Sequence, residues 1–398
     1  MQEIDQKRVL IIPDLYEGGG SGAVVTQVIV GFFKENNYKI GIMSSEFSKR
    51  KTEDNVECFP CRSFCGTANL RKGSYLSNFR TVLEDFRPSH LFFDGSITNK
   101  PLCYLEEGIK RNLNITVFIF MQDFFCSKYY ANDNLAPCTK CLDKGLISAF
   151  CSDCGVANIG ILKLAERIRT RNHLRMLLPK VQHVGTSTEE QLGFYTRFGI
   201  PRERSFKLPL PFDDSKLKDV NVNRGDYIVG IAQNRTEKGF QFIPQILKYT
   251  KSKVVLAYYD DETVKIHSED TKLKPFIECG QLKLVASSWK TGLGELIANS
   301  QGVIIPSIWP TTTEFGWLEA LALGKPTITF DISAHKEFME NRFNGLTSPI
   351  GDFKAMAANM DYLCSLDNIE YEKLTIKVKA LYATLTDWSG WKEFIKTL

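Results

Sequence analysis

Two carboxylates in the segment PTTTEFGWLEALALGKPTITFD, residues 310–331, are placed where they could do chemistry. Thr311 and Glu314 have the spacing of a helix capping box, which would make Glu314 part of the cap of a helix that begins near Thr312. Glu319 lies on the face of that helix expected to pack on a sheet, where an unpaired carboxylate is costly. The hydroxyl groups of a ribose would be a suitable partner for it, and the positive N-terminus of the same helix suits a diphosphate.

The end of this helix is marked by Gly324, because glycine readily adopts the left-handed conformation that follows a helix. We expect Lys325 to meet the negative end of the helix dipole. Pro326 then begins the next strand, so the segment predicts a loop, a helix and a strand in succession.

A glycine-rich loop, EGGGSGA, lies near the N-terminus and satisfies G-x-G-x-x-A between Gly18 and Ala23. This pattern leaves open a dinucleotide-binding oxidoreductase, with Glu46 at the end of the second strand as the acid for the ribose. However, the residues DLYE separate the first strand from the glycines, whereas the dinucleotide pattern has glycine directly after the strand. A longer loop could instead bring bare backbone amides to a phosphate or an acceptor, and a flexible turn is the remaining reading. The residues concerned are Gly18, Gly19, Gly20 and Ser21.

Four of the eleven cysteines form two C-x2-C pairs separated by nine residues, in CTKCLDKGLISAFCSDC. Four thiolates suit a closed tetrahedral zinc site in a reducing compartment, so we expect structural zinc and no catalytic metal. Four free thiols or a pair of reversible disulfides are the alternatives. The expected ligands are Cys138, Cys141, Cys151 and Cys154.

The composition is that of an ordinary globular protein, with 398 residues, 43% hydrophobic and 24% charged. A net charge of +4 does not suggest a nucleic-acid binder. The apolar runs have the length of strands, and the N-terminus leads directly into one, so neither a spanning helix nor a signal peptide is predicted. We therefore expect a cytoplasmic protein.

Short β-branched runs alternate with amphipathic helical stretches, which predicts an α/β chain with two doubly wound parallel sheets. The expected domains are 1–215, with a Cys-rich insert at about 126–156, and 225–375, followed by a helix over 376–398 that packs back toward the N-terminal domain. The expected strands are Val9–Pro13, Lys39–Met43, His90–Phe93, Ile115–Phe120, Val181–Gly185, Tyr227–Ala232, Lys253–Tyr258, Leu282–Val285, Gly302–Pro306 and Pro326–Phe330.

The segment PSIWPTTTEFGWLEALALGKP resembles the nucleotide-binding segment of retaining nucleotide-sugar glycosyltransferases of family four. That resemblance implies the GT-B fold, in which two Rossmann-like domains face each other across a cleft. It extends over the chain, through GGGSGAVVTQVIVGFFKENNYKIGIMSS, HVGTSTEEQLGFYTRFGIPRERSFKLPLPFD, GIAQNRTEKGFQFIPQIL and NRFNGLTSPIGD. Glu319 matches the family's ribose-binding Glu.

The sugar-facing positions depart from the family's pattern. Its first Glu aligns with Thr311 when no gap is introduced, whereas Glu314 lies closer to Glu319. Either Glu314 reaches the donor sugar or a threonine hydroxyl takes that role. The donor-binding residues implied by this segment are Glu319, Thr311, Thr312, Thr313, Phe315 and Gly316.

A His-Asp pair of the family corresponds to Gln122 and Asp123 in this chain. The resemblance places Asp123 among the catalytic residues and Gln122 beside the donor. Gln122 can donate a hydrogen bond but cannot exchange a proton. The family is thought to need no protein nucleophile, so this change does not exclude retaining transfer.

Two cations in AQNRTEKGF, Arg235 and Lys238, follow an apolar strand. The resemblance assigns them to the diphosphate, where negative charge grows as the glycosidic bond breaks. Fixed cations aimed at such charge are a large catalytic contribution. Lys238 matches in register, whereas the family's Arg aligns with Gln233. A solvated loop lysine is the structural alternative.

A basic amphipathic stretch, ILKLAERIRTRNHLRMLLPK, could lie on an anionic membrane surface or present a solvated helix face. Its cations are Lys163, Arg167, Arg169, Arg171, Arg175 and Lys180. The expected activity is retaining transfer of a sugar from a nucleotide-diphosphate donor to a glycan or lipid-linked glycan, in cell-surface polysaccharide synthesis. A dinucleotide-dependent oxidoreductase and a non-catalytic zinc-containing homologue stay open as alternatives.

Overall fold

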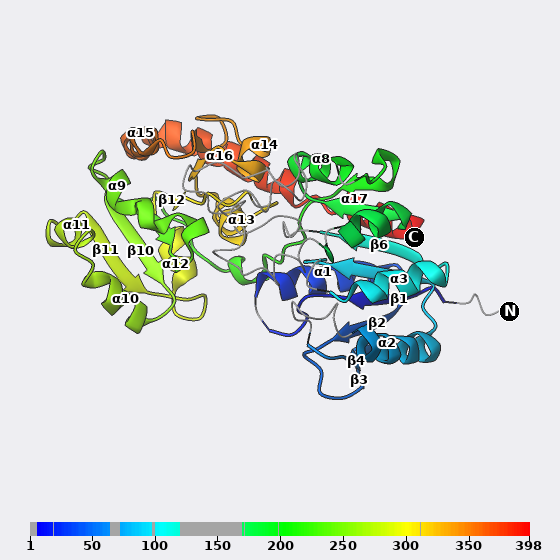
Figure 1. The fold of residues 1–398 in the computed structure, drawn as a ribbon. Helices are drawn as coiled ribbons and strands as arrows, with labels where there is room; N and C mark the ends of the chain where they lie inside the picture. The colour runs from blue at the N-terminus through cyan, green and yellow to red at the C-terminus, as the bar shows by residue number, and fades with distance from the viewer. Residues whose placement is uncertain are drawn as a thin grey trace. The chain divides into compact units, whose positions relative to one another are not determined.

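The computed structural model describes residues 6–18, 20–63, 72–97, 100–119, 169–170, 172–197, 199–310 and 312–398. Within this part the chain forms two compact units, shown as ribbons in Figure 1. The first unit takes the described residues up to Asp213 together with Thr386–Leu398, and the second takes Asp214–Leu385.

The first unit is built on a sheet with the strand order β3-β4-β2-β1-β5-β6-β7-β8. Its pairs are parallel except for β3 with β4. The strands are β1 (Arg8–Ile12), β2 (Lys39–Ser44), β3 (Lys51–Glu53), β4 (Val56–Pro60), β5 (His90–Asp94), β6 (Asn114–Phe118), β7 (His183–Thr186) and β8 (Ser205–Lys207). The helices described here are α1 (Ser21–Glu35), α2 (Lys72–Phe86), α3 (Leu102–Lys110), α8 (Glu189–Arg197) and α17 (Ser389–Thr397).

The second unit has an all-parallel sheet with the order β11-β10-β9-β12-β13-β14. Its strands are β9 (Ile228–Ile231), β10 (Val254–Tyr258), β11 (Leu282–Ala286), β12 (Gly302–Ile305), β13 (Thr327–Phe330) and β14 (Leu346–Ser348). Its helices are α9 (Ile243–Leu247), α10 (Asp261–Ser268), α11 (Lys274–Glu278), α12 (Leu293–Ala298), α13 (Phe315–Ala322), α14 (Ser333–Phe338), α15 (Phe353–Ser365) and α16 (Asn368–Leu385).

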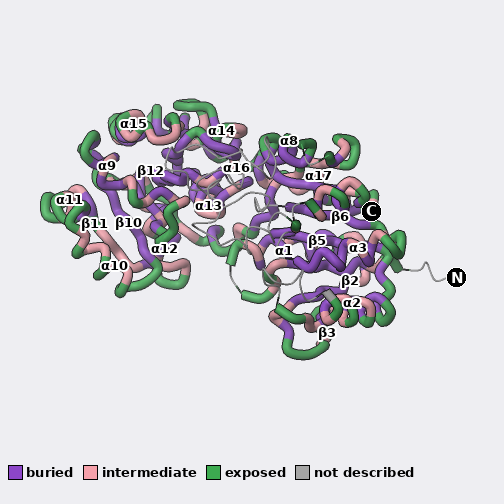
Figure 2. Tube along the Cα trace, viewed as in Figure 1, coloured by how far each residue is buried: buried purple, intermediate pink, exposed green. Residues whose placement is uncertain are grey.

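The hydrophobic pattern explains why these strands lie inside. β10 and β12 are buried along their whole length, as expected for parallel strands covered on both faces. In Figure 2 these strands are buried, whereas α10 and α11 carry no buried residue. The expected α/β class is confirmed, and each of the ten expected strands is present within one to two residues at its ends. The short strands β3, β4, β8 and β14 are not among those ten.

The helix α17 packs within the first unit through Trp391, whose side chain is fully buried. Its indole lies against Phe32 and Phe118, with ring centroids 6.0 and 4.7 Å away, and its N–H donates to the Pro209 carbonyl over 2.7 Å. The last helix therefore fills the core of the unit that begins the chain. No helix in the described ranges is both long and apolar enough to span a bilayer.

Candidate active site

The strand order of the second unit reverses between β9 and β12, which is where doubly wound sheets bind ligands beyond the carboxyl ends of their strands. Two loops meet there. The Ile308 N–H donates to the Glu237 carbonyl over 3.0 Å, and the Ser307 hydroxyl donates to the same oxygen over 3.2 Å. Gly239 makes this approach possible, because its φ is +75° and a Cβ would lie 1.8 Å from the Pro306 carbonyl oxygen.

Lys238 and Glu314 form an ion pair across this junction, with Nζ 3.2 Å from Oε1. The Lys238 ammonium also lies 5.0 Å from the centroid of the Trp309 ring. Burial raises the pKa of Glu314, but the charge of Lys238 opposes it, and the net pKa is below the ordinary value. Glu314 is therefore a buried, charged carboxylate held by a cation.

The prediction of a capping box with Glu314 inside the helix is wrong. α13 begins at Phe315, so Glu314 occupies the N-cap position and makes no side-chain capping hydrogen bond. Its carbonyl accepts from the N–H groups of Trp317 and Leu318, while its carboxylate turns to Lys238. The ion pair with a distant loop outweighs the local cap.

His335 lies beside this pair and was missed by the sequence reading. Its ring packs edge-on against Trp317, with centroids 4.9 Å apart. Burial lowers the pKa of His335 to about 4, assisted by Lys238 and opposed by Glu314 and the Phe330 backbone, so the ring is neutral at pH 7. The sequence carries no signal for it, because the φ of +47° at Ser333, the first residue of α14, is visible only in the structure.

Glu319 is buried as expected, and its partner in this structure is Lys216, with Nζ 2.6 Å from Oε1. Lys216 comes from the short 3-10 helix Ser215–Leu217, just inside the second unit. Burial raises the pKa of Glu319, and Lys216 and the Trp289 indole N–H oppose that rise. The carboxylate that the sequence assigns to a ribose is thus covered by a half-exposed lysine.

The remaining donor-side residues are placed as follows. Arg235 lies on the same loop as Lys238, but its side chain is 64% exposed and its guanidinium is 4.0 Å from Glu237. Thr312 and Thr313 are adjacent to Glu314, and the Thr313 hydroxyl donates to the Thr312 carbonyl. Phe315 and Gly316 form the first turn of α13.

Lys325 does not meet the helix dipole, which corrects a second expectation. Its side chain is buried and donates to the carbonyls of Asn223 and Ser300 over 2.6 and 2.8 Å. Burial lowers the pKa of Lys325 to about 8. Gly324 ends the helix with φ of +65°, as expected.

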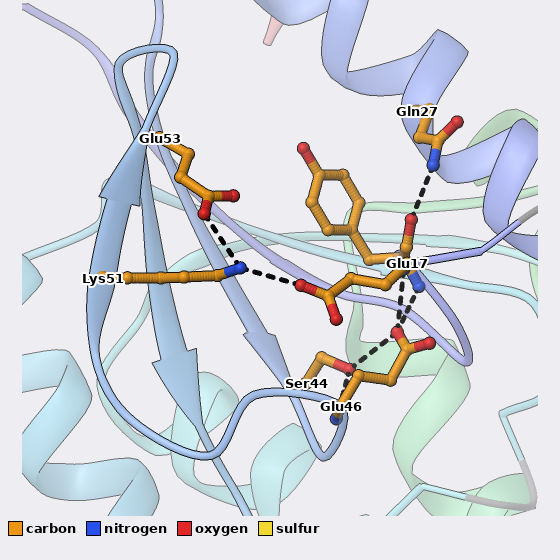
Figure 3. A network of polar contacts seen from close by, with 7 residues as sticks. Glu17, Gln27, Ser44, Glu46, Lys51 and Glu53 are labelled. Atoms are coloured by element: carbon orange, nitrogen blue, oxygen red, sulfur yellow. Dashed lines mark hydrogen bonds and ion pairs between the residues drawn. The ribbon is translucent and has the colours of Figure 1, made fainter.

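The glycine-rich loop of the first unit is held by Glu46. Its carboxylate accepts from the N–H groups of Tyr16 and Glu17, the latter over 3.1 Å. Figure 3 shows this contact, and shows the Lys51 ammonium between the carboxylates of Glu53 and Glu17. The backbone of the loop itself therefore occupies the Glu46 carboxylate. The hypothesis of a dinucleotide-binding oxidoreductase would need that carboxylate for a ribose.

The glycines precede α1. Gly18 has φ of +89°, Gly20 is the N-cap, and Ser21 is the first helical residue. Several other expected site residues lie outside the described residues: Gly19, Gln122, Asp123, Thr311, Cys138, Cys141, Cys151 and Cys154. Among the residues that the structure describes, no group of three or more His, Cys, Asp or Glu side chains could hold a metal ion.

Part of the basic stretch is described. Leu174, Leu177 and Leu178 are buried in the core of the first unit, and the His173 imidazole lies 2.7 Å from Glu106. Lys163, Arg167 and Arg171 lie outside the described residues. The described part thus packs its apolar side on its own unit, as the solvated-face reading expects.

The model of the family described as Glycosyl transferases group 1 matches residues 241–365. These residues form a glycosyl transferases group 1 domain. The matched range contains Trp289, Glu314, Glu319 and His335, whereas Lys216, Arg235 and Lys238 precede it. A search of the curated proteins found no match.

Solved structures extend the likeness over the whole chain. HepE from Anabaena, solved in complex with UDP, is similar with a TM-score of 0.65 and 12% identity, over 98% of this chain and 99% of that one. Sucrose-phosphate synthase from Thermosynechococcus elongatus has a TM-score of 0.69 and 9% identity, over 98% of each chain. A glycosyltransferase from Rickettsia africae has a TM-score of 0.65 and 12% identity, over 98% and 99%. The expected GT-B fold is confirmed, with the group 1 domain in its second unit.

Proposed function

We propose that this chain is a retaining glycosyltransferase that moves a sugar from a nucleoside-diphosphate donor to a glycan or lipid-linked glycan. The observation that carries the proposal is the ion pair between Lys238 and Glu314. It lies where the strand order of the second sheet reverses, in the unit that contains the group 1 domain. HepE, a structural neighbour, was solved with UDP and with UDP-glucose, which supports UDP-sugars as the first donors to try.

Each residue has a role in this proposal. Glu319 binds the ribose hydroxyls, and Glu314 or the neighbouring threonine hydroxyls bind the donor sugar. As the bond between the anomeric carbon and the phosphate oxygen breaks, its electron pair stays on the diphosphate. Lys238, with Arg235 on the same loop, stabilises that charge. The acceptor hydroxyl oxygen bonds to the anomeric carbon on the same face that the diphosphate leaves, and its proton passes to the departing diphosphate.

The test is the substitution Lys238→Ala. We expect turnover to fall by about 10²–10³-fold, the range found when one preorganised charge-stabilising group is removed. Lys238→Arg should recover part of the rate, because it restores the charge that also holds Glu314. Initial rates with UDP-glucose and other UDP-sugars measure the effect.

The matched control is Lys253→Ala in the same unit, because Lys253 is exposed and pairs only with exposed Asp226 among the contacts described. Its turnover should stay at the wild-type value. Normal turnover in a folded Lys238→Ala protein would refute the phosphate role. A thermal-shift panel of UDP, GDP, ADP, dTDP and NAD separates the alternatives: stabilisation by NAD alone supports the oxidoreductase, and no stabilisation supports a scaffold.

Three further parts of the proposal rest on the sequence. The four cysteines would bind structural zinc, and metal analysis of the purified protein that finds less than one equivalent would contradict it. The protein would act in the cytoplasm, in cell-surface polysaccharide synthesis. A peripheral contact through the basic stretch predicts co-sedimentation with anionic vesicles and none with neutral ones.

A further inference from the structure

An indole ring stands beside the buried carboxylate of Glu319. Trp289 follows the carboxyl end of β11, and its N–H donates to the Glu319 side chain. A Cβ on Gly294 of α12 would lie 3.1 Å from the ring, so this helix leaves just enough room for it. The turn between is fixed by Ser288, whose carbonyl accepts from the N–H of Leu293 over 3.0 Å. The Trp289 ring is therefore fixed by its N–H group and by the neighbouring helix α12.

The Lys216 ammonium lies over the face of the Trp289 ring. Lys216 Nζ lies 4.1 Å from the ring centroid while it pairs with Glu319. The Lys216 side chain is 39% exposed, whereas that of Glu319 is 7% exposed. A flexible, hydrated cation can leave such a site at little cost, and its departure would expose both the Glu319 carboxylate and the face of the Trp289 ring.

We propose that Trp289 is the surface on which the nucleobase of the donor stacks, and that Lys216 holds this place until the donor arrives. This inference rests on the proposed function, because it takes Glu319 as the ribose ligand. In a nucleoside the base is attached to the carbon next to the one that carries the 2′-hydroxyl. A ribose held by Glu319 therefore carries its base within a ring's width of that carboxylate, and Trp289 is bonded to the same carboxylate.

Stacking on an indole favours a nucleoside diphosphate over a bare diphosphate without selecting one base, because every base has a π-face. When the donor binds, Lys216 releases Glu319 to the ribose hydroxyls and leaves the face of the Trp289 ring to the base. The site thus exchanges a cation on the ring for a base on the ring.

The substitution Trp289→Ala tests this inference, with UDP and inorganic pyrophosphate as probes in calorimetric titrations. We expect the Kd for UDP to rise at least about fivefold, the lower bound for loss of one base–aromatic stack, and the Kd for pyrophosphate to stay unchanged. Trp289→Phe keeps an aromatic face and should bind UDP within about threefold of wild type.

Fluorescence gives a readout that does not depend on the stability of the Ala variant. UDP should quench the tryptophan emission of the wild type, and Trp289→Phe should lose most of that quenching while still binding UDP. An unchanged Kd for UDP in Trp289→Ala, equal losses for UDP and pyrophosphate, or full quenching in Trp289→Phe would overturn the inference. A wild type that binds no nucleoside diphosphate would overturn the proposed function itself.

Discussion

Each of the two sheets reverses its strand order once beside its first strand, and each places a lysine and a carboxylate there. In the first unit the reversal lies between β1 and β5, with Asp14 just after β1 and Lys100 after β5. In the second it lies between β9 and β12, with Lys238 after β9 and Glu314 after β12. The same topological position therefore holds a lysine–carboxylate pair in both units, but the more deeply buried partner differs.

The first unit buries the cation. Lys100 is 1% exposed and donates to Asp14 Oδ1 over 2.6 Å, to the Ser96 carbonyl over 2.9 Å and to the Asp94 carbonyl. Asp14 Oδ2 accepts from the Ser96 N–H, and Gly95, with φ of +81°, is required because a Cβ would lie 2.5 Å from that oxygen. All three ammonium hydrogens are used, so this network has no capacity left for a ligand.

The second unit buries the carboxylates instead. Glu314 is 8% exposed against 16% for Lys238, and the difference between Glu319 and Lys216 is larger. A cation that is more exposed than its partner can turn toward an incoming anion. In the first unit the buried cation uses its hydrogen bonds within the fold, whereas in the second unit the cation is the more exposed partner of each pair, which fits the binding role that we propose for it.

The substitution of Lys100 should have the largest effect on the free energy of unfolding. Lys100→Met should lower the free energy of unfolding by about 3–5 kcal/mol, because it leaves Asp14 without its buried partner and two carbonyls without a donor. Urea denaturation followed by circular dichroism measures this. A loss below about 1 kcal/mol would show that the network is not saturated as described.

The next largest effect should come from His335, which makes the free energy of unfolding depend on pH. Its pKa is about 4 in the folded chain and about 6.5 when unfolded, so the unfolded state binds more protons between these values. Stability should therefore fall by about 3 kcal/mol as pH falls from 6.5 to 4. His335→Leu should remove this part of the slope, measured as the difference in unfolding free energy from wild type at pH 7 and pH 4.

His90, whose pKa burial lowers to about 3, adds a slope of the same sign to both proteins. Parallel pH curves for the two proteins would contradict the assignment.

The smallest effect is expected for Lys216. Lys216→Met should cost about 1 kcal/mol of unfolding free energy, because the Lys216 side chain is partly exposed and Glu319, whose pKa burial already raises, can accept a proton. The same urea experiment compares it with Lys100→Met. A cost equal to that of Lys100→Met would remove the distinction between the two units.

The sequence predicted the sheets well because strands buried on both faces leave strong apolar runs, such as GVIIP and VVLAY. It also predicted that Glu319 would be buried. It did not predict that Glu314 would pair with Lys238, or that Lys325 would serve two carbonyls, because those partners are distant in sequence. Local patterns such as the capping box describe only neighbours along the chain, and His335 and Trp289 carry no such pattern.

The packing of α17 has a consequence for synthesis of the protein. Trp391 belongs to the core of the first unit, although the whole second unit precedes it in the chain. During synthesis, the N-terminal sheet therefore keeps an open hydrophobic gap until Trp391 has been added to the chain. A nascent chain halted before Trp391 should therefore be a substrate for chaperones even when its second unit is already native.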